Sequence, residues 1–138
     1  MGKVNEDRVY NIIRKKWAKR QISKLFDEYS SYDFYDSKYS YLLKSRKCDH
    51  DTYATTLISE MKCNKRIYLL FLFTDGLYYI KYKKDKFKKY NKKCFVKIRD
   101  DKKDVCKYYY FIPVEDLKKI EKKNNIIKND KEIFIVYF

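Results

Sequence analysis

IYLLFLFTDG, at residues 67–76, is the most strongly patterned segment of the chain. Its seven consecutive apolar residues, Ile67 to Phe73, are too few to span a membrane and predict a central strand that is buried on both faces. Asp75-Gly76 follows, and this dipeptide strongly favours a β-hairpin turn. The chain then returns through residues 77–83 as the partner strand. We therefore expect a β-sheet with this hairpin at its centre.

Upstream of this hairpin, the sequence predicts two helices and a pair of strands. Over residues 6–29, apolar side chains recur at steps of three and four, which is the period of an amphipathic helix. Residues 32–36 and 39–46 are rich in tyrosine and suit two short strands joined by a tight turn. A second helix is predicted over residues 52–63, because four apolar side chains fall on one stripe there: Ala54, Leu57, Ile58 and Met61.

Downstream, residues 95–99 and 107–112 are expected as strands on either side of a polar loop at 100–104. Pro113 ends the second strand and suits the start of a helix over 114–123, which would bury Leu117 and Ile120. Residues 133–138 close the chain as a strand. This order of elements predicts one α+β domain over residues 1–138, with a mixed β-sheet and flanking helices.

The chain is strongly basic. Its 138 residues include 34 Lys and Arg against 19 Asp and Glu, which gives a formal charge of +15. Such an excess is typical of proteins that bind a polyanion. AT-rich codons account for the preference for Lys over Arg, but they also encode Asp and Glu. The imbalance of sign therefore favours nucleic acid as a partner.

The basic charge is concentrated between residues 81 and 99. One acid, Asp85, stands there against ten cations, which we expect to neutralise phosphates: Lys81, Lys83, Lys84, Lys86, Lys88, Lys89, Lys92, Lys93, Lys97 and Arg99. Arg46, beside the predicted strand pair, joins this set. So does the basic face of the first predicted helix, with Arg14, Lys15, Lys19 and Arg20. Four rings are interleaved with the lysines and are expected to pack into the core: Tyr82, Phe87, Tyr90 and Phe95.

A family resemblance rests on two acids and a lysine. Asp33 and Asp36 lie at the end of one predicted strand, and Lys44 lies within the next, in the segment YLLKSR at 41–46. This pattern resembles the PD-(D/E)xK nucleases, the restriction-endonuclease-like superfamily. The expected order of helix, acidic hairpin, helix and hydrophobic strand is also similar to the core of that family. The resemblance implies a restriction-endonuclease-like core in which Asp33 or Asp36 holds Mg²⁺ and Lys44 positions the attacking water.

The motif departs from the family pattern at its second acid, which is replaced by Leu42. A carboxylate from elsewhere, such as Glu28 or Glu60, would have to complete the metal site. A second register restores the acid, with Asp49 or Asp51 followed by Glu60-Met61-Lys62. That register falls in the predicted helix, where residues two apart do not share a face. A strand over residues 56–63 would favour it instead.

The soft metal ligands form no known zinc pattern. The four cysteines contain no C-x-x-C pair and are expected as thiols: Cys48, Cys63, Cys94 and Cys106. His50 is the only histidine, and it suits a general base beside Asp49 or Asp51.

For function, the sequence predicts an intracellular protein, cytoplasmic or nuclear, that binds nucleic acid, with DNA as the expected form and no membrane contact. The nuclease-like core implies a metal-dependent DNA endonuclease or a degenerate, non-catalytic form of one. Cleavage of both strands of a duplex would favour a homodimer. The alternative is a non-enzymatic interaction or adaptor protein, whose charge reflects the AT-rich genome of a virus or parasite.

Overall fold

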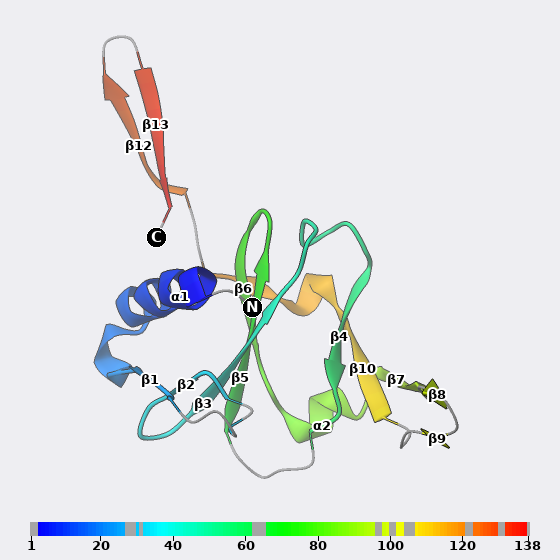
Figure 1. Ribbon diagram of the computed structural model, residues 1–138. Coiled ribbons are helices and arrows are strands. Elements are labelled where there is room, and N and C mark those ends of the chain that lie inside the picture. The colour runs from blue at the N-terminus through cyan, green and yellow to red at the C-terminus, as the bar shows by residue number, and fades with distance from the viewer. Residues whose placement is uncertain are drawn as a thin grey trace.

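The computed structural model describes residues 3–26, 30, 32–61, 66–95, 98–99, 102–103, 107–120, 123–129 and 132–137 (Figure 1). Its main sheet has six strands in the order β1-β2-β3-β5-β6-β11. Their bounds are β1 Ser23–Lys24, β2 Phe34–Tyr35, β3 Ser40–Ser45, β5 Ile67–Phe73, β6 Gly76–Lys81 and β11 Lys118–Lys119. β3 and β5 are parallel and the other neighbours are antiparallel. The predicted α+β class and mixed sheet are therefore confirmed.

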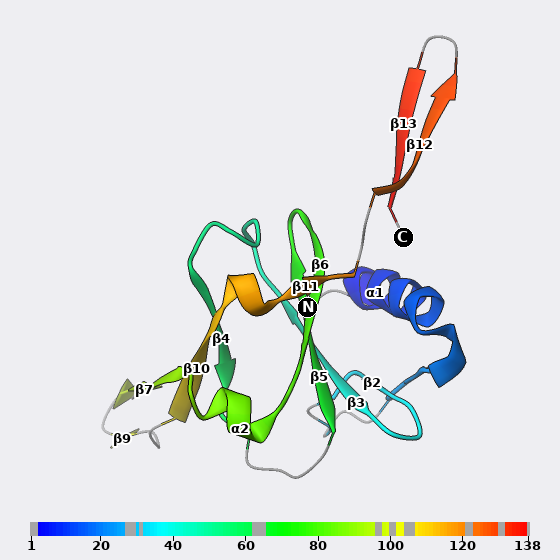
Figure 2. The same ribbon diagram turned by 180° about the vertical axis from the view of Figure 1, so that it is seen from behind.

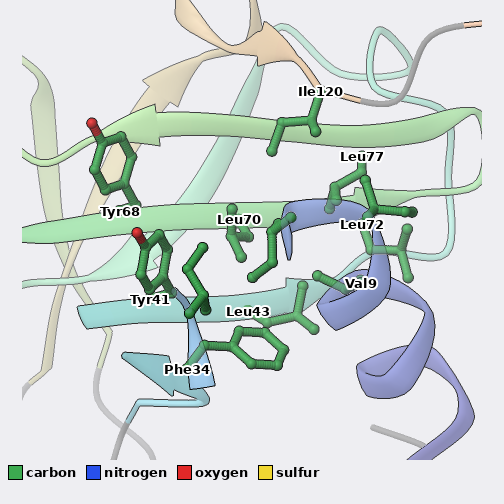
Figure 3. Packing of buried hydrophobic residues seen from close by; sticks show 12 residues of the cluster. Val9, Phe34, Tyr41, Leu43, Tyr68, Leu70, Leu72, Leu77 and Ile120 are labelled. Carbon is green, nitrogen blue, oxygen red and sulfur yellow. The ribbon is translucent and has the colours of Figure 1, made fainter. Parts of the chain in front are cut away.

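β5 is the centre of this sheet, and all seven of its residues are buried. The side chains of Tyr68, Leu70 and Leu72 join a cluster with helix α1 (Lys3–Lys16), which Figure 3 shows from close by. The odd-numbered side chains, from Ile67 to Phe73, join a second cluster on the opposite face. Layers on both faces explain why this strand carries no polar position.

The second layer is a three-stranded antiparallel sheet in the order β4-β10-β7. Its strands are β4 (Thr55–Ser59), β10 (Lys107–Pro113) and β7 (Asn91–Phe95). It packs Ile58, Tyr110 and Ile112 against the odd-numbered side of β5. The short helix α2 (Lys84–Phe87) connects β6 to β7, on the far side of the molecule from α1 (Figures 1 and 2).

The remaining elements are short or stand apart from the core. They are the 3-10 turns η1 (Ala18–Arg20) and η2 (Val114–Asp116), the ribbon of β8 (Ile98–Arg99) and β9 (Lys102–Lys103), and the hairpin of β12 (Lys123–Asn129) and β13 (Glu132–Tyr137). In both views the β12–β13 hairpin extends away from the body of the domain (Figures 1 and 2). Among the described residues, no helix has the length and apolar character needed to cross a membrane.

The helix predicted over residues 6–29 is wrong beyond Lys16. The chain passes through η1 to Gln21, whose φ of 53° is left-handed and ends helical propagation. Tertiary contacts hold this turn: the Arg20 guanidinium lies over the rings of Trp17 and Tyr68 at 4.3 and 4.7 Å. Residues 27–29 lie outside the described part of the chain. The amphipathic period marked the buried positions Val9, Ile12 and Ile13 within α1, but it overran the real helix end, and Phe26 in the overrun is exposed.

The helices predicted over 52–63 and 114–123 are also wrong. Residues 55–59 form β4, and β-branched Thr55 and Thr56 suit a strand better than a helix. Leu57 and Ile58 then point to opposite faces instead of sharing one stripe. Residues 114–119 form η2 and β11, although Leu117 and Ile120 are buried as expected.

The other predicted strands are confirmed with shifted ends. The hairpin at residues 67–81 is present as β5 and β6, and β2, β3, β10 and β13 lie within or close to their predicted ranges. Of the strand predicted over 95–99, residue 95 ends β7 and residues 98–99 form β8. Residues 96–97 lie outside the described part.

The central strand gives a direct test of this architecture. We expect Phe71→Ala to lower the free energy of unfolding by about 3–5 kcal/mol, since Phe71 is 0% exposed between the two layers. Phe26→Ala is the matched control, because Phe26 is 88% exposed and its loss should change stability by less than about 0.5 kcal/mol. Urea denaturation followed by circular dichroism measures both. Equal effects of the two substitutions would contradict the fold.

Candidate nucleic-acid interface

The basic run is arranged around α2, with its lysines outward. Five lysines between residues 83 and 89 are exposed, and Asp85 is the single acid among them: Lys83, Lys84, Lys86, Lys88 and Lys89. Phe87, in the same short helix, is 0% exposed. In this segment the lysines therefore form a charged outer surface, and the Phe87 ring anchors the segment in the core.

The interleaved rings pack into the core, as predicted. Phe87 meets Tyr82, Tyr90 and Tyr110 at centroid distances of 4.8, 5.1 and 5.7 Å. The Tyr90 hydroxyl donates to the Asp116 carboxylate at 2.7 Å, and burial together with this carboxylate raises the Tyr90 pKa. The side chain of Phe95 lies outside the described part.

Strand β7 continues the basic surface beside α2. Lys92 and Lys93 are exposed there, and the Lys92 ammonium lies 2.7 Å from Glu60 and over the ring of Tyr108. Lys93 lies over the ring of Phe111 at 5.6 Å. The exposed lysines of the α2 segment and β7 are adjacent along the chain, and we call them the α2–β7 surface: Lys83, Lys84, Lys86, Lys88, Lys89, Lys92 and Lys93. Within β7, Lys93 shares the outer face with Tyr109, whereas Lys92 is paired with Tyr110 on the other face. Lys97 and the Arg99 side chain lie outside the described residues.

Lys81 is separated from this surface. It is half-buried at the end of β6, and its ammonium lies over the ring of Tyr39 at 5.2 Å. The Arg20 guanidinium also lies over the Tyr39 ring, and Tyr39 packs against the hydrophobic cluster that includes α1. Lys81 therefore lies on the α1 side of the main sheet.

A cleft of about 650 Å³ lies along β4, the edge strand of the three-stranded sheet. Its lining includes Tyr53, which is 67% exposed, and the β10 rings of Tyr109 and Phe111. Tyr109 is paired with Lys93 across the β10–β7 ladder, and directly paired residues point to the same face of a sheet. The outer face of this sheet therefore joins aromatic rings of the cleft to a lysine of the α2–β7 surface.

Arg46 lines the same cleft, but all three of its guanidinium nitrogens are engaged by the protein. Nε donates to Thr56 Oγ1 at 3.1 Å, Nη1 to the Ser45 carbonyl at 3.2 Å and Nη2 to the Leu57 carbonyl at 2.6 Å. The guanidinium also lies over the Phe71 ring, and burial lowers its pKa. Arg46 thus fastens the edge strand β4 to the end of β3. The sequence carries no local signal for this contact.

The two acids of the nuclease-like motif lie near β3 and accept hydrogen bonds from the protein, whereas its lysine, Lys44, lines the cleft. Both oxygens of Asp36 accept hydrogen bonds, from the amides of Lys38 and Tyr39 and from the Tyr41 hydroxyl. Asp33 accepts the amide of Leu43 at 2.8 Å, and Lys44 lines the cleft. Asp36 therefore shapes the turn between β2 and β3, and Asp33 holds the chain beside β3.

These carboxylates do not fit a Mg²⁺ site. Asp36 has no uncommitted oxygen, and the family's second acid is apolar Leu42, which packs against the core. Mg²⁺ needs oxygen ligands in near-octahedral geometry. Glu60 pairs with Lys92 at the other layer, and Glu28 lies outside the described residues. The element order behind the resemblance also changes, because its second helix is strand β4.

The second register meets its strand condition only in part. Residues 55–59 are a strand, whereas Lys62 lies outside the described part. Asp51 precedes β4 and Glu60 follows it, so the length of the strand, roughly 15 Å, separates their backbones. The structure does not bring these two acids together.

His50 has a partner that the sequence did not indicate. Its Nδ1 lies 2.5 Å from Asp75 Oδ2, and its ring stacks on Tyr78 at 4.6 Å. Burial and the nearby carboxylates of Asp75, Asp51 and Asp49 raise the pKa of Tyr78 to about 12. Asp75 is 25 positions away in the turn between β5 and β6, so no local spacing could have revealed the pair.

The cysteines differ from one another. Cys48 is a free thiol at the edge of the cleft, as predicted. Cys94 is disulfide-bonded, which corrects the expectation of a thiol at that position.

The Arg46 contact predicts a stability effect from a change that keeps the charge. We expect Arg46→Lys to lower the free energy of unfolding by about 1–3 kcal/mol, because a lysine cannot satisfy Thr56 and Leu57 together. Arg66→Lys is the control, since Arg66 is exposed. Urea denaturation of both variants decides. A loss as large in the Arg66 variant as in the Arg46 variant would exclude this role for Arg46.

Asp33 predicts a pH dependence of stability. Burial raises its pKa above the ordinary 3.8, opposed by the Leu43 amide and the charge of Lys44. The folded state therefore holds the proton more tightly than the unfolded chain, and this contribution is lost as pH rises through the folded pKa. We expect Asp33→Asn to gain stability relative to the wild type as pH rises from roughly 4 to 7, since the amide oxygen still accepts from Leu43. A pH series of urea denaturation measures the difference, which a merely exposed carboxylate would leave constant.

Comparisons with known proteins complete the description of the site. No family model, curated protein or solved structure matches the chain.

Proposed function

We propose that this domain binds nucleic acid, with the phosphates on the α2–β7 surface and unpaired bases along the outer face of the β4-β10-β7 sheet. The observation that carries the proposal is the separation of roles within residues 82–93. Tyr82 and Phe87 are buried and Tyr90 is half-buried, while the lysines of the segment are exposed. Lys93 is paired with Tyr109, one of the rings that line the cleft. Polyanion binding needs such clustered and accessible cations.

The electrostatic part of the proposal rests on charge density. Between residues 83 and 89, five exposed lysines stand against one acid within a segment of seven residues. Lys93 extends this charge to the outer face of the sheet, over the Phe111 ring. A flexible ammonium suits the phosphate backbone as a point charge and reads no sequence. We therefore expect binding that depends strongly on salt and weakly on base sequence.

The aromatic part of the proposal favours single strands over duplex. Tyr53 is exposed at the cleft, and Tyr109 and Phe111 line it from β10. Bases that are not paired can stack on such rings, at about 1–3 kcal/mol per base. A duplex keeps its bases stacked on each other and would contact only the lysines. Hydrolysis is not part of the proposal, because Asp33 and Asp36 do not fit a metal site.

The rival function is a non-enzymatic adaptor, and the two functions differ in what they predict for the lysines. In an adaptor whose lysines reflect codon usage alone, cations would be spread without regard to the aromatic cleft. The test is therefore whether position matters when net charge is held constant.

We expect the wild-type chain to bind a fluorescent single-stranded oligothymidylate with a linear dependence of log affinity on log salt. Lys88→Gln/Lys89→Gln should reduce the slope by about 1.4, because each lost phosphate contact on a single strand contributes about 0.7. Lys16→Gln/Lys19→Gln is the matched control, since it removes the same charge near the end of α1. Fluorescence anisotropy at several salt concentrations measures all three proteins.

The same binding assay tests the contribution of the aromatic rings with a separate substitution. Tyr53→Ala should weaken binding of the single strand about 5- to 150-fold without changing the salt slope, as expected for the loss of one stacked base. Tyr35→Ala, an exposed tyrosine on β2, is the control. Absence of binding at low salt, or equal losses in both lysine variants, would refute the proposal.

A further inference from the structure

One site on this basic chain gathers carboxylates around the only histidine. His50, Asp51 and Asp75 each offer a ligand atom, and these atoms lie within 4.8 Å of one another. No other group of three or more such side chains occurs among the described residues. His50 also lines the end of the cleft along β4. The site is therefore accessible and opposite in charge to the rest of the protein.

Two loops are fixed together at this site. The Thr74 amide donates to the Cys48 carbonyl at 3.0 Å, and the His50 amide donates to Asp75 Oδ1 at 2.9 Å. The His50 ring is further held by stacking on Tyr78 and by the edge of Phe73. The loop before β4 and the turn between β5 and β6 thus hold the imidazole and the Asp75 carboxylate before any ligand arrives.

We propose that His50, Asp51 and Asp75 bind a divalent transition-metal ion of the Zn²⁺ type. One imidazole and two carboxylates are a common ligand set for such ions, and three protein ligands leave a tetrahedral ion one open position. Mg²⁺ and Ca²⁺ prefer sites made of oxygen alone, so the imidazole selects against them. The proposal is independent of nucleic-acid binding.

The ion would lie between His50 Nδ1 and Asp75 Oδ2, in place of the hydrogen bond between these atoms and of the contact between Nδ1 and the Tyr78 hydroxyl at 2.9 Å. Nδ1 and Oδ2 are 2.5 Å apart and would separate to about 3.3 Å around a tetrahedral ion with bonds of about 2.0 Å. A neutral imidazole would bind the ion through Nδ1 and carry its proton on Nε2. Side-chain rotation supplies this opening, because the Asp75 carboxylate is partly exposed.

Asp51 distinguishes a metal site from a purely structural contact. His50 and Asp75 already join the two loops, whereas Asp51 is exposed and makes no hydrogen bond within the described part of the chain. A structural role alone gives Asp51 nothing to do. A metal ion needs it as the third ligand.

The test is calorimetric titration of the whole 138-residue chain with Zn²⁺. We expect one equivalent to bind the wild type, and we expect Asp51→Asn to weaken binding at least tenfold while leaving the thermal unfolding of the metal-free protein unchanged. Asp85→Asn is the matched control, because Asp85 is exposed on α2. His50→Gln should remove the site, and circular dichroism establishes that this variant folds.

Thiols are excluded by a second probe. Co²⁺ bound at this site should show no thiolate-to-cobalt charge-transfer band, and Cys48→Ala should bind Co²⁺ as the wild type does. Equal Zn²⁺ affinities for the wild type, Asp51→Asn and Asp85→Asn would overturn the proposal. So would a thiolate band, or an absence of Zn²⁺ binding to the wild type.

Discussion

Burial of β5 on both faces governs the whole structure. Its odd-numbered and even-numbered side chains enter two separate hydrophobic clusters, so a helix must cover one face and a second sheet must cover the other. Strand β3 joins β5 in parallel, which requires the chain to cross over between Ser45 and Ile67, and β4 forms within that crossover. The cleft and the α2–β7 surface follow from this arrangement, because both lie on the layer that is formed by the crossover and by the segment after β6.

The lysines and the arginines of the described residues have different positions around this core. The anchors of the α2 segment are aromatic, with Phe87 fully buried, while the lysines of the segment are exposed. Arg20 and Arg46 instead direct their guanidinium groups to rings, hydroxyls and carbonyls of the protein. In this chain arginine is a structural residue at these two positions, while exposed lysine supplies the outward charge.

The hydrophobic pattern of the sequence correctly predicted those elements that are buried in the same way along their whole length. β5 and its hairpin were predictable, because a run of seven apolar residues followed by Asp75-Gly76 is compatible with few structures other than a buried strand and a tight turn. Residues 52–63 were not, since Leu57 and Ile58 fit a helical stripe equally well until β10 supplies a partner. The candidate site was harder still. The pairing of His50 with Asp75 and the clamp of Arg46 on Leu57 join residues far apart in sequence, and only the folded chain brings them together.

If lysines and rings act together in binding nucleic acid, they must do so on one layer of the molecule. Amide NMR of the whole chain, titrated with a single-stranded oligonucleotide, reports where the ligand lies. We expect shifts confined to α2, β7 and the outer face of β10, including Tyr109 and Phe111. Shifts centred on α1 and the β1–β2 pair, or no shifts at low salt, would contradict this joint role.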